Sequence, residues 1–170
     1  METELEYKLA NSNKADLIAF ISFTPNAFGE LVALALSDRH PYNWKAAWLI
    51  SCIIHTNDNR VQPFVNQIIN KMPVKQESMN RLYLMILHKM KIDVNSEGKL
   101  FATCMTIWEN TKTMQSIRYN AMKMMLSIAE KYPELQNDIA FLLEEHYLET
   151  FTKGIKHSLK LLQKDFHPSK

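Results

Sequence analysis

Hydrophobic residues recur about every 3.6 positions in successive blocks of the chain, and polar or proline-containing junctions separate these blocks. Each block has the length of an ordinary helix. The chain has only three glycines and six prolines in 170 residues, which leaves little material for the tight turns of a sheet-rich fold. The pattern therefore predicts helices over residues 11–22, 25–37, 41–55, 60–72, 76–92, 96–110, 115–132, 133–147 and 150–166.

The blocks share a register when the sequence is shifted against itself by 37 residues. Equivalent positions form columns such as Trp44–Arg81–Arg118, Ala47–Leu84–Ala121 and Val65–Ala102–Ile139. One helix pair cannot bury its apolar face alone, so stacked pairs are expected to share a continuous core. We predict a single helical-repeat domain over residues 1–170, with helix pairs at about 11–37, 41–72, 76–110 and 115–147 and a capping helix at 150–166.

The fourth helix pair carries a family resemblance. Residues 116–122 read Ser-Ile-Arg-Tyr-Asn-Ala-Met, and residues 128–133 read Ile-Ala-Glu-Lys-Tyr-Pro. These segments resemble a unit of the HEAT/armadillo family of helical repeats. The resemblance implies an all-α fold, a short α-solenoid of antiparallel helix pairs wound into a right-handed superhelix, whose second helices line a concave surface. A four-helix bundle is the alternative fold.

Composition and charge indicate the cellular location of the protein more than its function. The net charge of +2 is too small to indicate nucleic acid or membrane by itself. The acidic start of the chain lacks the features of a secretory signal, and the longest apolar run, 46–54, is about half of the roughly 20 residues that span a bilayer. We expect a cytoplasmic protein, with Cys52 and Cys104 as buried free thiols of a reducing compartment.

No pattern of catalytic or metal-binding residues emerges from the sequence. The six histidines form no HExxH pair, and no Glu-x-x-His motif suggests a dinuclear carboxylate site. Cys52 and His55 are three residues apart and could pair as nucleophile and base, but Cys52 lies in the apolar segment WLISCII, where burial makes a thiol inert. We therefore expect no metal, no cofactor and no enzymatic activity.

Two groups of residues are candidates for binding a partner. Gln62, Asn66 and Asn70 share one side of the 60–72 helix, which the family resemblance places on the concave surface. The column Trp44, Arg81 and Arg118 would form a ladder across three repeats if it is exposed. Because the resembled family consists mostly of protein-binding scaffolds, the leading hypothesis is an interaction module for a protein or peptide partner.

The last helix supports a second hypothesis. Lys153, Lys156, Lys160 and Lys164 share one face of it, either as the solvated surface of a capping helix or as a stripe that binds phosphates. Some HEAT-like proteins resemble DNA glycosylases for alkylated bases, which use an aspartate in a basic groove, and Asp138 is the only acid that we nominate for that role. Exposed ends of the stack could also support a homodimer.

Overall fold

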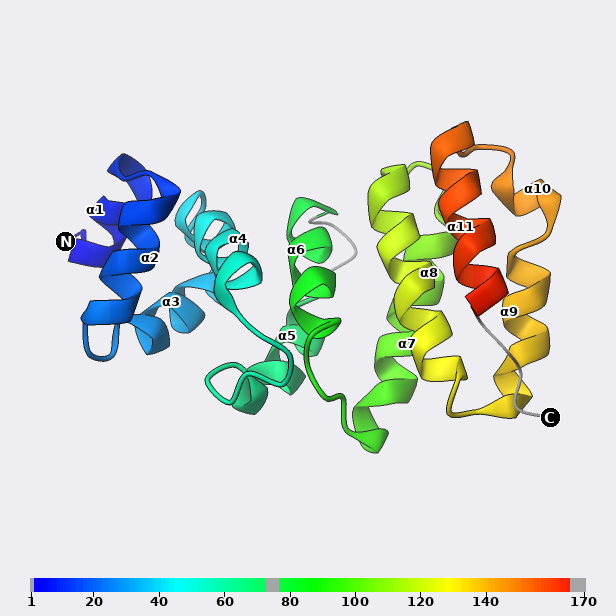
Figure 1. Ribbon diagram of the computed structural model, residues 1–170, viewed down its shortest axis with the longest axis horizontal. Coiled ribbons are helices and arrows are strands. Elements are labelled where there is room, and N and C mark those ends of the chain that lie inside the picture. Colours follow the sequence, from blue (N-terminus) through cyan, green and yellow to red (C-terminus); the bar gives the residue numbers. More distant parts are fainter. Residues whose placement is uncertain (1, 73–76, 166–170) are drawn as a thin grey trace. The chain divides into compact units, whose positions relative to one another are not determined.

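The computed structural model describes residues 2–72 and 77–165, and every regular element in these ranges is helical. The chain divides into two compact units, Met1–Ile92 (unit 1) and Asp93–Lys170 (unit 2), which are described separately (Figure 1). The helices that the two units contain confirm the predicted all-α fold, and the right-handed superhelix stays a prediction. The helices expected to pair at 76–92 and 96–110 fall on either side of the division.

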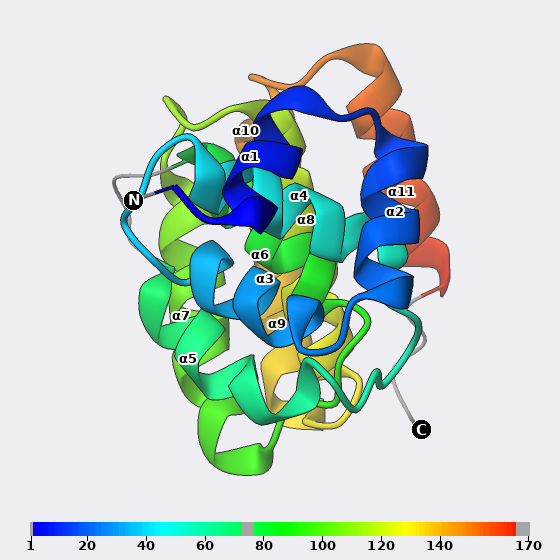
Figure 2. The same cartoon turned by 90° about the vertical axis from the view of Figure 1, so that its left-hand side faces the viewer.

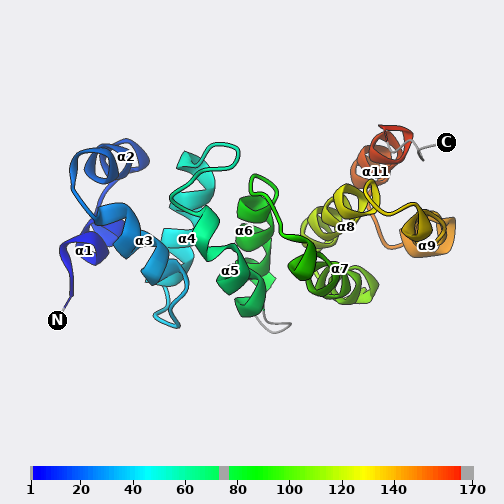
Figure 3. The same ribbon diagram turned by 90° about the horizontal axis from the view of Figure 1, so that it is seen from below.

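Unit 1 is built from six α-helices and one short 3₁₀ helix within the residues that the structure describes there. In chain order they are α1 (Glu4–Asn11), α2 (Lys14–Phe23), α3 (Ala27–Ala35), α4 (Tyr42–Ile53), η1 (Gln62–Phe64), α5 (Val65–Lys71) and α6 (Glu77–Leu87). Helix α4 packs against both α3 and α6, and α5 packs against α6 (Figure 3). The predicted helix pairs stay a prediction.

The core of unit 1 lies where α4 meets α3 and α6. Ala47 and Leu84, which share a column of the 37-residue register, are fully buried there. The Tyr83 hydroxyl donates a hydrogen bond to the Ala35 carbonyl at 2.9 Å and so joins α6 to the end of α3. The Lys89 ammonium donates to the carbonyls of Ser51 and Ile54, which satisfies main-chain groups left open where α4 ends.

Unit 2 is organised around α8. Its described elements are α7 (Val94–Glu109), α8 (Gln115–Ala129), η2 (Pro133–Leu135), α9 (Gln136–Leu142), α10 (Glu145–Leu148) and α11 (Lys153–Asp165). Both α7 and α11 pack on α8, and Leu159 of α11 is buried at the second of these contacts (Figure 1). Trp108 of α7 is fully buried and stacks on Phe151, with 5.2 Å between the ring centroids.

The start of the chain and the 60–72 helix differ from the prediction. Residues 4–11 form α1, which the prediction omitted; Thr3 caps it, and the Glu6 carboxylate accepts the Thr3 N–H in return. Figure 2 shows α1 and α2 as two separate helices joined by a turn. The predicted 60–72 helix starts as η1, with Pro63 in its first turn, and the regular α-helix begins at Val65.

The other differences concern the end of the chain and the second helix of the fourth pair. The predicted 133–147 helix is divided into η2, α9 and α10, and Glu144 has an extended backbone at the break. The predicted helix limits Gln76 and Phe166 lie outside the described residues. None of the described helices is long and apolar enough to span a bilayer.

Candidate functional site

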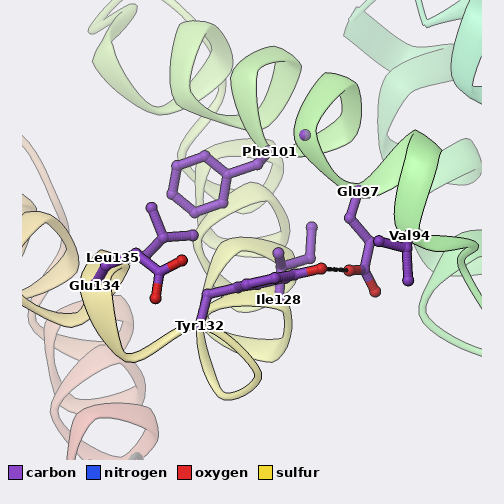
Figure 4. A pocket seen from close by; sticks show the side chains of 8 residues that line it. Val94, Glu97, Phe101, Ile128, Tyr132, Glu134 and Leu135 are labelled. Carbon is purple, nitrogen blue, oxygen red and sulfur yellow. Dashed lines mark hydrogen bonds between the residues drawn. The ribbon is translucent and has the colours of Figure 1, made fainter.

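A pocket of about 310 Å³ opens on the surface of unit 2. It lies where the first turns of α7 face the end of α8 and the start of η2. Its lining residues are Val94, Glu97, Gly98, Phe101, Ile128, Tyr132, Glu134 and Leu135. In Figure 4, Phe101 extends from α7 toward Leu135, and the Tyr132 ring lies beneath them with its hydroxyl directed at Glu97.

Helix α7 supplies one wall of the pocket from a single face. Val94, Gly98 and Phe101 are four and three residues apart, a spacing that brings side chains to one side of a helix. The Asp93 carboxylate caps this helix by accepting the Ser96 N–H at 3.1 Å, so the first turn that carries Val94 is fixed. A Cβ placed on Gly98 would meet no atom within 4 Å, so the missing side chain leaves open space beside the pocket.

The polar edge of the pocket is anchored by a buried carboxylate. Glu97 is only 2% exposed. The Tyr132 hydroxyl donates to Glu97 Oε2 at 2.6 Å, and the Lys131 ammonium donates to Glu97 Oε1. These two donors belong to the chain that follows α8, 34 and 35 residues beyond Glu97. The carboxylate therefore ties α7 to the segment that leads into η2.

Ionisation of this edge follows from these contacts. Burial raises the pKa of Glu97, but the hydrogen bonds from Lys131 and Tyr132 and the Lys131 charge outweigh it, so the pKa lies below its ordinary value. The hydrogen bond to Glu97 raises the pKa of Tyr132, since losing the proton would set two anions against each other. Glu97 is thus an anion near neutral pH, and Tyr132 keeps its proton.

The pocket combines an apolar interior with hydrogen-bond acceptors. Four lining side chains are apolar, and the polar ones are two carboxylates and a phenol whose hydrogen is already donated to Glu97. The volume lies near the lower end of the about 300–1,000 Å³ typical of ligand pockets. Among the described residues no group of three histidine, cysteine or acidic side chains could hold a metal ion. The arrangement suits binding of an apolar group that carries donors beside it.

A family model for the HEAT repeat domain matches residues 1–165. The chain belongs to the HEAT repeat family. Comparison with curated proteins gives no match, and comparison with solved structures gives none either. HEAT repeats are generally scaffolds for protein interaction.

Most of the predicted binding residues belong to unit 1, whereas the pocket belongs to unit 2. Gln62 lies in η1. Its side-chain amide donates a hydrogen bond to the Lys91 carbonyl at 2.7 Å and accepts one from the Lys91 N–H at 3.2 Å. Its role in the structure is therefore to fix the segment after α6. Asn66 and Asn70 are exposed on α5 of the HEAT repeat.

The expected exposed column Trp44, Arg81 and Arg118 is wrong at its third member. Trp44 is 38% exposed on α4, and Arg81 is exposed on α6. Arg118 is only 1% exposed, because the segment after α10 covers this side of α8. Its guanidinium donates to the Trp108 carbonyl at 2.7 Å and to the Thr150 hydroxyl at 2.8 Å, so it cannot contact a partner in this structure.

Arg118 instead organises the interior of unit 2. Its guanidinium carbon lies 4.3 Å from the centroid of the Phe151 ring and 5.1 Å from that of Trp108. Burial lowers its pKa, since the surroundings are less polar than water. The side chain links α7, α8 and the segment before α11, which is a structural role.

The lysine stripe is present on α11. Lys153, Lys160 and Lys164 are exposed, and the half-buried Lys156 forms an ion pair with Glu145 at 3.2 Å. Leu159 is buried on the opposite side, as the periodicity predicted. The proposed glycosylase aspartate, Asp138, is exposed on α9.

The prediction of two buried thiols is half wrong. Cys104 is buried in α7, and burial raises the pKa of its thiol. Cys52 is exposed on α4, although its neighbours Ile50 and Ser51 are buried. His55 forms its bond not with Cys52 but with the buried carboxylate of Asp58, at 2.8 Å.

The pocket residues Glu97, Gly98 and Tyr132 were missed by the sequence-based prediction. One signal was available: Val61, Gly98 and Leu135 occupy the same column of the 37-residue register. Val61 is 1% exposed, so the column favours a buried side chain, and glycine is the departure. A single glycine inside an apolar helical pattern marks a place where a side chain is missing from the surface.

Proposed function

We propose that this HEAT repeat protein is a non-enzymatic interaction module that binds a protein or peptide segment, with the unit 2 pocket as a principal contact. The observation that carries the proposal is the open apolar pocket beside α7 and η2. The predicted pairing assigns both elements to second helices, which in HEAT-like stacks line the concave surface that partners use. Asn66, Asn70, Trp44 and Arg81 are the secondary contacts proposed in unit 1, and the cytoplasm is the proposed setting.

The pocket favours peptide over nucleic acid as a ligand. Nucleic-acid grooves are lined with basic side chains that neutralise phosphates. The polar side chains that line this pocket are Glu97, Tyr132 and Glu134, none of which carries a positive charge. A phosphate placed here would meet two carboxylates, whereas an apolar peptide side chain would find an apolar surface to cover.

Peptide display against the full chain tests this proposal. We expect the wild type to enrich a set of sequences that the Gly98→Leu variant does not retain, because the added side chain would occupy the open space. Gly154→Leu is the matched control: it adds the same side chain to a helical glycine of α11 with equally open surroundings. Enrichment that survives Gly98→Leu, or no enrichment by the wild type, would reject the pocket as the contact.

The exposed lysines of α11 favour a second candidate, non-enzymatic binding of nucleic acid. Anisotropy of labelled duplex and single-stranded DNA across a salt series would detect it. Binding that weakens steeply with salt and drops when Lys153, Lys156, Lys160 and Lys164 are all changed to glutamine would support this candidate, since counterion release sets the slope. No binding at low salt would dismiss it, together with the glycosylase hypothesis that rests on Asp138.

A further inference from the structure

We infer that the unit 2 pocket recognises a segment that inserts one large apolar side chain and places an adjacent lysine or arginine against Glu134. This inference rests on the proposed function and adds the chemistry of the partner. Val94, Phe101, Ile128 and Leu135 supply the apolar surface, and Gly98 leaves space between them. A volume of about 310 Å³ suits a short side-chain cluster better than a large cofactor.

The charge of the partner follows from the hydrogen-bonding state of the pocket. Glu97 accepts from both Lys131 and Tyr132, so its two oxygens already have partners. The Tyr132 hydroxyl donates its hydrogen to Glu97, so its oxygen can only accept a further hydrogen bond. Among the lining side chains, only hydrogen-bond acceptors thus remain for a ligand, and they complement the N–H groups of a lysine, an arginine or a peptide backbone.

Glu97 and Glu134 have different roles in this recognition. Glu97 is buried and bound on both oxygens, so it is a positioning residue that holds Tyr132 in place. Glu134 is exposed at the rim and forms no ion pair with any described residue. It is therefore the carboxylate available to a cation on the partner, while the apolar side chain enters beside Phe101.

Three pools of displayed peptides test this specificity on the full-length protein. Each pool fixes two adjacent positions and varies the rest: an apolar residue (Leu, Met or Phe) followed by Lys or Arg, the same apolar residues followed by Asp or Glu, and Ala followed by Lys or Arg. We expect the apolar–basic pool to be enriched about tenfold over each of the others. Equal enrichment of the apolar–acidic pool would overturn the inference.

Variants at the rim separate local recognition from general electrostatics. Glu134→Gln should weaken binding of an enriched apolar–basic peptide by up to about fivefold, the range of one exposed ion pair, and Glu134→Lys should weaken it further. Glu130→Lys is the matched control, because it makes the same charge change at an exposed position outside the pocket lining. Equal effects of Glu134→Lys and Glu130→Lys would also overturn the inference.

The outcome with Gly98→Leu distinguishes this inference from the proposed function. If peptides depend on Gly98 but show no preference for a basic neighbour, the inferred specificity is wrong and the interaction module stands. If no pool depends on Gly98, both are wrong. Circular dichroism and thermal unfolding of each variant would confirm that binding is measured on folded protein.

Discussion

Two members of one column of the 37-residue register, one from each unit, differ in their side chains and surroundings. In unit 1 the position is Val61, whose side chain is buried, and 37 residues later in unit 2 it is Gly98, beside open space. The aromatic residue three positions on, Phe64 or Phe101, is half-buried in both units. Leu135, the next member of this column, has an aliphatic side chain that lines the pocket, so the open space belongs to Gly98 in particular. A residue that differs in kind from its equivalents in the repeat therefore indicates a candidate site.

Asp58 of unit 1 and Glu97 of unit 2 are both buried carboxylates, and they differ in how far along the chain their partners lie; Glu6, a second buried carboxylate of unit 1, also has a distant partner, Arg39. Asp58 of unit 1 binds His55 and Arg60, both within three residues of it, and thereby fixes a local turn. Glu97 of unit 2 binds Lys131 and Tyr132, which are more than 30 residues away. A local anchor stabilises a junction, whereas the long-range anchor joins two elements and forms the edge of a pocket.

The largest effect is expected from emptying the core of one unit. Trp108→Ala should lower the free energy of unfolding by about 3–5 kcal/mol, because it removes a fully buried ring that packs on Phe151 and Arg118. Leu84→Ala, the counterpart in the core of unit 1, should cost about 2–5 kcal/mol. Hydrogen exchange should show each loss mainly in the amides of its own unit. Equal deprotection of both units by either variant would show that they unfold together.

The next largest effect concerns the buried carboxylates. Glu97→Gln and Asp58→Asn should each cost about 1–2 kcal/mol, since hydrogen bonds to a charged group are lost while partly exposed partners regain water. Urea unfolding would measure both. Only Glu97→Gln should also weaken a peptide bound in the pocket, because Asp58 belongs to unit 1. Equal loss of peptide binding in both variants would contradict the division of roles.

Acid should separate these two anchors. The pKa of folded Glu97 lies below its ordinary value of 4.5, so as pH falls through that range the unfolded chain takes up the proton first and stability declines. Hydrogen bonds from Arg60 hold the pKa of Asp58 far below its ordinary value of 3.8, so its contribution should persist to lower pH. The urea midpoint of each variant would be compared with that of the wild type at pH values from 7 down to 3. The difference for Glu97→Gln should therefore vanish at a higher pH than the difference for Asp58→Asn. A difference for Asp58→Asn that vanishes at the higher pH would reverse this order.

Alanine substitutions at Val61 and Gly98 test the comparison between these two positions directly. Val61→Ala should destabilise the protein by about 1–2 kcal/mol, since buried methyl groups are lost. Gly98→Ala should stabilise it by about 1 kcal/mol, because alanine favours a helix and its Cβ meets nothing within 4 Å. Gly154→Ala controls for helix propensity away from the pocket. A destabilising Gly98→Ala would show that the space beside α7 is not open.

Much of the fold follows from hydrophobic periodicity. Helices α4, α6 and α8 match predicted blocks closely, since each buries one broad apolar face. Helix α1 was missed because its short apolar pattern was not recognised, although Thr3 and Glu6 form a capping box that the sequence contains. The break before α10 has no comparable mark in the sequence.

The candidate site was less accessible to sequence analysis, for two physical reasons. Register places Arg81 and Arg118 on the same face of equivalent helices, but the segment around Thr150 and Phe151 covers only Arg118. Exposure therefore depends on the next packed element, not on the helix alone. The pocket also depends on a missing side chain at Gly98 and on a bond between residues 35 positions apart, Glu97 and Tyr132, which periodicity does not encode.

The smallest effect on stability should come from Cys52, and it supplies a probe for each unit. Cys52→Ser should change the free energy of unfolding by less than about 0.5 kcal/mol, because the side chain is exposed. A thiol reagent should modify Cys52 of the folded wild type at once and reach Cys104 only after unit 2 opens, since the buried thiol is inaccessible and its raised pKa suppresses the thiolate. In Cys52→Ser, labelling in rising urea therefore follows unit 2 alone. Rapid modification of both thiols in the native protein would place Cys104 at the surface and contradict the packing of α7 against α8.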